Sequence, residues 1–66
     1  MTAIIVNGEQ KETRAERLEN LLNELGLNPL LILIEYNGQA LPRSEWEKVR
    51  IVTGDKLELL SVAAGG

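Results

Sequence analysis

The sequence contains no cysteine and no histidine, and only 3 % of its residues are aromatic. The missing residue types exclude disulfides, thiol and imidazole nucleophiles, and the usual zinc sites. Basic residues are outnumbered, with seven against ten acidic ones and a net charge of −3 at pH 7. Because a nucleic-acid-binding domain needs a cationic surface to displace counterions, we expect no nucleic-acid partner.

Long hydrophobic runs are missing too. The longest is Leu30–Ile34, which is far shorter than the about 20 apolar residues that a membrane-spanning helix needs. Residues 1–7 contain no basic segment ahead of an apolar one, so no secretory signal is predicted. We therefore expect a cytoplasmic protein that does not act at a membrane.

The length of 66 residues allows one small domain. A chain of this size buries only about 60 % of the surface that its unfolded form exposes, so its margin of stability is small. The hydrophobic share of 44 % and the charged share of 26 % are those of a globular protein. We expect a domain at residues 1–62 and a flexible tail at residues 63–66, because nothing larger than alanine follows Val62.

The N-terminal segment predicts a hairpin. Residues 4–6 are apolar and β-branched, which favours a strand. Asn7-Gly8 then supplies two residues that tolerate positive φ, as a type I′ turn requires. The return strand at residues 9–12 is polar and has almost nothing to bury, so it is expected at an edge of the sheet.

One amphipathic helix is predicted over Arg14–Leu25. Thr13 and Glu16 have the spacing of a capping box at its start, and Gly26 stands where a helix usually ends. The apolar stripe at helical spacing consists of Leu18, Leu21, Leu22 and Leu25. A single helix of this kind has to bury its stripe on a sheet, so the predicted class is an α+β two-layer fold.

A second Asn-Gly pair predicts a second hairpin. Asn37-Gly38 follows Leu30–Ile34, an apolar run typical of a strand that is covered on both faces or covered by a partner. Residues 39–41 can pair with this strand briefly, before Pro42 ends the ladder.

The segment after Pro42 is predicted to hold a short helical turn and one strand. Ser44 and Glu47 repeat the capping-box spacing over too few residues for more than about one turn of helix. A turn at Thr53–Asp55 precedes residues 56–59, which alternate polar and apolar. Because residues 60–62 continue in the opposite phase, this strand is expected to change exposure near its end.

No group of residues indicates catalysis by the chain itself. None of the ten acidic residues has a partner at a spacing that suggests a catalytic pair, so solvated surface is the simpler explanation. Lys11, Lys48 and Lys56 lack the apolar surroundings that activate a catalytic lysine. Neither Asn-Gly pair belongs to a phosphate-binding loop. We expect no enzyme activity, no metal and no cofactor of the chain's own.

The last four residues, Ala63–Gly66, carry the strongest functional signal. Glycine lacks a Cβ atom, so a Gly-Gly end can pass in an extended form through a channel too narrow for other residues. Such an end would bring an unhindered carboxylate to the active site of a partner. A remnant of cloning is the ordinary alternative for two terminal glycines.

Further segments complete a resemblance to a known family. Pro42–Trp46 is similar to the Pro-Arg-x-x-Trp segment of the ThiS family, and Gly54-Asp55, the last strand and Ala64–Gly66 match that family as well. The chain thus resembles the ubiquitin-like sulfur carriers of the β-grasp fold, and among them the carriers of thiamine biosynthesis. The resemblance implies a mixed four- to five-stranded sheet packed on one amphipathic helix.

The resemblance also implies that the carboxylate of Gly66 is the group that reacts. A ThiF-like adenylyltransferase would use ATP to adenylate it, and sulfur from a cysteine desulfurase or an equivalent source would then convert it to a thiocarboxylate. Thiazole synthase would take this sulfur for the thiazole ring of thiamine. Gly65, Ala64 and Ala63 would thread into the active sites of these partners.

Partner contact is expected on the sheet face near the last strand. The candidates there are Leu57, Leu59, Leu60, Ile32 and Ile34. An ordinary place in the core is the alternative for these residues. Trp46 is interpreted as a cover over the core rather than a binding anchor, and Arg43 as a residue that is solvated or paired locally.

Two other functions stay open. A carrier of this kind can also supply sulfur for molybdopterin or for the 2-thiolation of tRNA. A ubiquitin-like protein modifier, joined through Gly66 to a lysine of its target, would end in the same two glycines. The terminal glycines are common to all these proteins, whereas Pro42-Arg43 with Trp46 favours the thiamine pathway.

Overall fold

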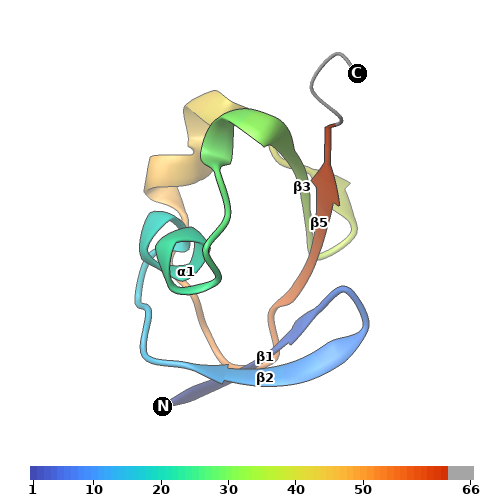
Figure 1. The fold of residues 1–66 in the computed structure, drawn as a ribbon. Coiled ribbons are helices and arrows are strands. Elements are labelled where there is room, and N and C mark those ends of the chain that lie inside the picture. Colours follow the sequence, from blue (N-terminus) through green and yellow to red (C-terminus); the bar gives the residue numbers. More distant parts are fainter. Residues whose placement is uncertain (63–66) are drawn as a thin grey trace.

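The computed structural model describes residues 1–62, which form a sheet with a helical layer on one face (Figure 1). The strands are β1 (Thr2–Val6), β2 (Glu9–Thr13), β3 (Ile32–Tyr36), β4 (Gln39–Ala40) and β5 (Lys56–Ser61). The helical elements are α1 (Leu18–Glu24) and two 3-10 helices, η1 (Pro29–Leu31) and η2 (Arg43–Lys48). The tail expected at residues 63–66 lies outside the described residues. No helix within residues 1–62 is long and apolar enough to cross a bilayer.

The five strands have the order β2-β1-β5-β3-β4, so the last strand of the chain lies in the middle of the sheet. It runs parallel to β1 and antiparallel to β3. The two outer pairs are hairpins, and Asn7 and Asn37 both have a φ of 51°, which confirms the turns predicted from Asn-Gly. The polar strand β2 is an edge, as expected.

The helix begins later than the capping-box pattern predicts, at Leu18 instead of Arg14. The intervening backbone is bonded to another part of the chain, because Ile51 N donates to the carbonyl of Glu16 and Leu18 N to that of Val49. Thr13 therefore ends β2 and caps no helix. Its hydroxyl accepts from Ala15 N and donates to the Glu24 carboxylate, both at 2.9 Å. The prediction of a helix over Arg14–Leu25 is wrong at its N-terminal end.

The run Leu30–Ile34 is not one strand covered on both faces. Its first residues belong to η1, and within β3 the side chains of Ile32 and Ile34 are buried whereas Leu33 is 62 % exposed. In β5, Leu57 and Leu59 are buried and Leu60 is 52 % exposed, which is the ordinary alternation; the predicted change of exposure is seen only at Ser61, which is exposed although it follows Leu59 by two residues.

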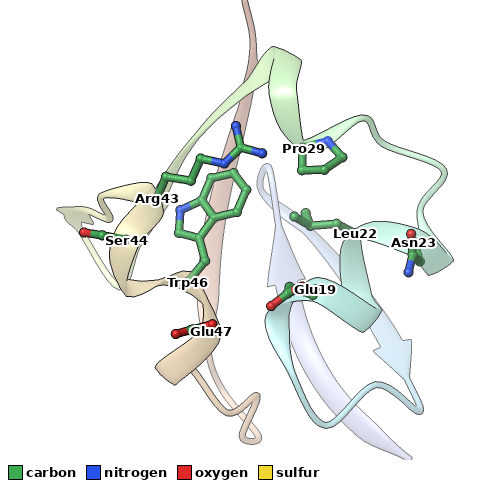
Figure 2. A pocket seen from close by; sticks show the side chains of 8 residues that line it. All are labelled: Glu19, Leu22, Asn23, Pro29, Arg43, Ser44, Trp46 and Glu47. Carbon is green, nitrogen blue, oxygen red and sulfur yellow. The ribbon is translucent and has the colours of Figure 1, made fainter.

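The 3-10 helix η2 holds the single tryptophan of the sequence in place. Pro42 is its N-cap, so Ser44 lies inside the helix and does not cap it as its spacing with Glu47 suggested. The indole N–H of Trp46 donates to the carbonyl of Leu41 at 3.0 Å, and the guanidinium of Arg43 lies 5.3 Å from the centre of the indole ring (Figure 2).

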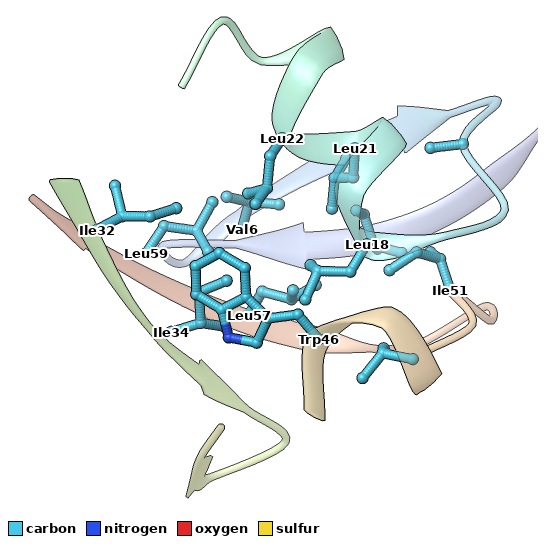
Figure 3. Close-up of a cluster of buried hydrophobic side chains, with 13 residues drawn as sticks. Val6, Leu18, Leu21, Leu22, Ile32, Ile34, Trp46, Ile51, Leu57 and Leu59 are labelled. Atoms are coloured by element: carbon cyan, nitrogen blue, oxygen red, sulfur yellow. The ribbon is translucent and has the colours of Figure 1, made fainter. Parts of the chain in front are cut away.

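The core lies between the sheet and the helical layer (Figure 3). The apolar stripe of α1 packs there through Leu18, Leu21 and Leu22, which confirms the helical face read from the sequence. Trp46 is 6 % exposed and covers the core from the side of η2, as interpreted from the sequence. The buried residues are Ile4, Val6, Ala15, Leu18, Leu21, Leu22, Ile32, Ile34, Trp46, Val49, Ile51, Leu57 and Leu59.

Candidate functional site

The candidate site is the end of β5, where the chain leaves the sheet toward its C-terminus. The last described residue, Val62, donates its N–H to the carbonyl of Leu31 at 2.6 Å, so the chain is still bonded to η1 at this point. The predicted reactive residue Gly66 and the threading residues Gly65, Ala64 and Ala63 lie outside the described residues. Their roles stay predictions.

β5 is fixed on the β1 side by a side chain that continues the ladder between the strands. The backbone N–H of Asn7 donates to the carbonyl of Leu57 at 2.9 Å. Two residues further along β5, the side chain of Asn7 makes the bonds that the backbone of a neighbouring strand would make. Its Oδ1 accepts from Leu59 N at 2.7 Å, and its Nδ2 donates to the Leu59 carbonyl at 3.2 Å. The pairing of β5 is thereby extended toward its C-terminal end.

A buried carboxylate fixes the start of β5. Asp55 is 4 % exposed and accepts hydrogen bonds from Tyr36 Oη at 2.8 Å, Val52 N at 2.9 Å and Asn37 Nδ2 at 3.2 Å. The pKa of Tyr36 is raised to about 12, mainly by burial and also by the hydrogen bond to Asp55 and the charge of Asp55. These contacts connect the turn before β5 to the β3–β4 hairpin, so the role of Asp55 is structural.

The structure places most of the predicted partner-face residues in the core. Ile32, Ile34, Leu57 and Leu59 are at most 8 % exposed, so the alternative explanation, a place in the core, applies to these four. Leu60 is the one candidate on the surface, and its partner role stays a prediction.

Leu60 belongs to a larger exposed surface that the sequence analysis did not assemble. It lies directly opposite Leu33 in the β3–β5 ladder, and cross-strand neighbours point to the same face of a sheet. Leu31 and Val62, bonded through their backbones, continue this surface toward the tail. The four exposed side chains form the outer apolar patch: Leu31, Leu33, Leu60 and Val62. Strand alternation separates Leu31 and Leu33 from Ile32 and Ile34, but the sequence does not tell which of the two sets is buried.

Acidic side chains border this patch. Glu35 and Glu58 lie directly opposite each other in the same ladder, two residues from Leu33 and Leu60 and on the same face. Neither carboxylate is paired with a lysine or arginine within the described part of the chain. Like charges directly opposite each other destabilise a sheet, so this pair suits a surface that meets a basic partner.

Comparison with known proteins decides the family. The sequence model of the ThiS family matches residues 4–66, which is nearly the whole chain. The chain belongs to the ThiS family. Proteins of this family are sulfur carriers of thiamine biosynthesis and not enzymes.

A solved ThiS structure has the same fold. The crystal structure of the thiamine biosynthesis protein ThiS from Geobacter metallireducens superposes with a TM-score of 0.82 at 28 % sequence identity. The match covers 98 % of this chain and 100 % of that one. It confirms the β-grasp fold and the mixed sheet with one α-helix that the resemblance implied.

Curated relatives include one much longer protein. A thiazole synthase from Paramagnetospirillum magneticum is 34 % identical over 64 residues, a match that covers 96 % of this ThiS-family chain but only 20 % of that protein. The chain therefore spans about a fifth of that relative. An uncharacterized protein, ycf40, from Trieres chinensis is 34 % identical over 62 residues, covering 92 % of this chain and 85 % of that one.

Proposed function

We propose that this chain is a sulfur carrier whose Gly66 carboxylate is adenylated and then converted to a thiocarboxylate that donates sulfur for the thiazole ring of thiamine. The observation that carries the proposal is the ThiS-family match, which extends through residue 66 and so includes the Gly-Gly end. A ThiF-like adenylyltransferase activates the carrier, a cysteine desulfurase or an equivalent source supplies the sulfur, and thiazole synthase accepts it.

The proposed chemistry fits a chain without histidine or cysteine. A carboxylate resists nucleophilic attack because it is anionic and has no good leaving group. Attack of the Gly66 carboxylate on the α-phosphate of ATP forms the acyl adenylate and releases pyrophosphate. The terminal sulfur of the desulfurase persulfide then displaces AMP from the carbonyl carbon and forms an acyl disulfide, and a thiol reductant cleaves its S–S bond to release the thiocarboxylate. The resulting thiocarboxylate is ionised at neutral pH, so the carrier needs no base of its own to offer a nucleophilic sulfur.

The folded domain holds the strand that precedes the proposed reactive residue in a fixed position. β5 is the central strand, and hydrogen bonds from Asn7 to Leu59 and from Val62 to Leu31 hold its C-terminal part. A partner that grips this end of the sheet can therefore draw the following residues into its active site without unfolding the domain. Glycine at positions 65 and 66 keeps that end slender.

The outer apolar patch and the Glu35–Glu58 pair are the proposed contact surface for these partners. Exposed apolar side chains beside a functional end often mark a protein interface, and the unpaired carboxylates favour a partner with basic residues at the rim. A similar stretch within the P. magneticum thiazole synthase supports a synthase as the acceptor of the sulfur.

Deletion of Gly66 tests the reacting group. We expect the shortened chain to lose all adenylation, measured as ATP–pyrophosphate exchange with the activating enzyme, and to keep its urea midpoint because every core residue lies between positions 4 and 59. A Met1 deletion, also of one terminal residue, is the control and should exchange normally. Equal exchange by the Gly66-deleted and full-length chains would refute the proposal.

The fate of the sulfur tests the pathway. Protein isolated from its native source should show, by mass spectrometry, one sulfur in place of one oxygen at its C-terminus. With labelled cysteine, the desulfurase and thiazole synthase, the label should enter the thiazole product. Label that enters molybdopterin or tRNA instead, a branched isopeptide adduct, or a native chain that continues past Gly66 without processing would contradict it.

A further inference from the structure

A groove lies between α1 and η2, on the helical layer and away from the outer face of the sheet (Figure 2). Its volume is about 390 Å³, within the range of sites that accept a small ligand or a few side chains. We call it the α1–η2 groove. It is lined by Glu19, Leu22, Asn23, Pro29, Arg43, Ser44, Trp46 and Glu47.

The floor of the groove is apolar and firmly held. Leu22 and Trp46, which form it, are 2 % and 6 % exposed, whereas the other lining residues are exposed. The indole ring cannot turn freely because its N–H is bonded to the Leu41 carbonyl and Arg43 lies over its face. A shallow site with mostly exposed walls does not enclose a free small molecule, but it suits a side chain presented by another protein.

The rim of the groove is charged, and its two ends differ. Figure 2 shows the carboxylates of Glu19 and Glu47 on facing sides at one end, and the guanidinium of Arg43 beside Pro29 at the other. Within residues 1–62, neither glutamate is in an ion pair with a basic side chain.

Two basic side chains close to Glu47 in the sequence or in space already have other bonding partners. The Arg17 guanidinium donates to the main-chain carbonyl of Glu47 at 3.2 Å, and Lys48 is paired with Glu45 at 3.5 Å. The acidic end of the groove is therefore open to a cation from outside.

The 3-10 helix η1 connects the groove with the end of the described chain. Pro29 lines the groove and begins η1, while Leu31 ends η1 and bonds to Val62. Pro29 and Leu31 are only two positions apart, so η1 lies between the groove and the point where the chain leaves the sheet. A protein bound at the end of β5 therefore meets η1 and the Arg43 end of the groove first, and the acidic end at Glu19 and Glu47 lies beyond it.

We propose that the α1–η2 groove seats a lysine or arginine side chain of the enzyme that adenylates Gly66, with the cation between Glu19 and Glu47 and the aliphatic stem on Leu22 and Trp46. This assignment rests on the proposed function. An enzyme that binds ATP gathers cationic groups around the polyphosphate, and the carrier that docks beside them has a net charge of −3. Charge complementarity selects this partner.

The test compares two charge-matched double variants in binding to the adenylyltransferase. Glu19→Gln with Glu47→Gln removes the acidic end of the groove, and Glu12→Gln with Glu16→Gln removes the same charge from exposed positions elsewhere. We expect the first pair to weaken binding about fivefold, as two exposed ion pairs would, and to reduce its salt dependence. The control pair should change Kd less than about twofold on the same scale. Equal urea midpoints show that both variants are folded.

A second readout locates the contact. The sequence has one tryptophan, so its indole N–H gives a single NMR signal, and this signal should shift when unlabelled adenylyltransferase is added. Equal Kd values for the two double variants, or an indole signal that does not move on binding, would overturn the assignment while the carrier function stands. No pyrophosphate exchange with the wild-type chain would instead overturn the proposed function, and this assignment with it.

Discussion

Asn7 and Asn37 bind the same strand from its two sides. Each is the first residue of an Asn-Gly turn with a φ of 51°, and each directs its side-chain amide at the backbone of β5. Asn7 bonds to the N–H and carbonyl of Leu59, near the end of the strand, and Asn37 Oδ1 accepts from Lys56 N at its start. The two asparagines thus form the turns and also bind the backbone of β5, the strand that precedes the proposed reactive end.

Asn7→Asp should destabilise the domain while preserving the turn. Aspartate tolerates the same positive φ, but it has no N–H for the carbonyl of Leu59 and places a carboxylate oxygen against it. We expect the free energy of unfolding to fall by about 1–3 kcal/mol, measured by urea denaturation. Asn20→Asp, on the exposed side of α1, is the control and should change it by less than about 0.5 kcal/mol. Equal losses in the two variants would show that the amide contact contributes nothing.

Ionisation of Tyr36 should weaken the fold at high pH. Its folded-state pKa is raised from 10.0 to about 12, so the neutral phenol is favoured in the folded state. The contribution to stability is therefore complete below pH 10 and is lost as the pH rises toward 12. Because the sequence has one tyrosine, tyrosinate absorbance follows this group alone. A wild-type midpoint at the ordinary value would contradict this assignment.

Asp55→Asn separates the causes of that shift. The substitution removes the charge beside Tyr36 and leaves the phenol at the same burial. Since burial is the largest cause, we expect the midpoint for Tyr36 to fall below that of the wild type while staying above 10.0. The absorbance titration measures it, with circular dichroism showing that the variant is folded at the start. An unchanged midpoint would mean that Asp55 does not act on Tyr36.

Leu22→Ala should cost much more stability than Leu30→Ala. Leu22 is 2 % exposed in the core, whereas Leu30 is 70 % exposed on η1. Removal of a buried leucine side chain costs about 2–5 kcal/mol, a large share of the stability of a domain this small. The exposed site should lose less than about 0.5 kcal/mol. Urea midpoints that coincide for the two variants would mean that the buried face of α1 is misassigned.

Leu60→Ser should weaken partner binding more than it weakens the fold. Leu60 lies in the outer apolar patch, while Val52 has a similar exposure, 56 % against 52 %, and lies outside it. We expect Leu60→Ser to raise the Kd for the adenylyltransferase about tenfold and Val52→Ser to leave it unchanged, both with small losses in urea midpoint. Identical binding by the two variants would remove the patch from the interface.

Several features of this ThiS-family chain could be predicted because their signals are local. Both Asn-Gly turns depend on the φ preferences of two adjacent residues, and the leucine stripe of α1 depends on helical spacing alone. The start of α1 could not be predicted in this way. The capping-box residues Thr13 and Glu16 are adjacent to a segment whose backbone bonds to residues 49–51, and those distant partners prevailed over the local signal.

The sequence by itself determined the turns, the helical face, the two-layer class and the Gly-Gly end on which the proposed chemistry depends. Tertiary structure alone decided which apolar residues of β3 and β5 face the core and which stay exposed. The reason is geometric: in a strand each side chain points opposite to its neighbour, so the roles of Ile32 and Leu33 follow from pairing with Ser61 and Leu60. A run of five apolar residues contains no such information until its partner strand is in place.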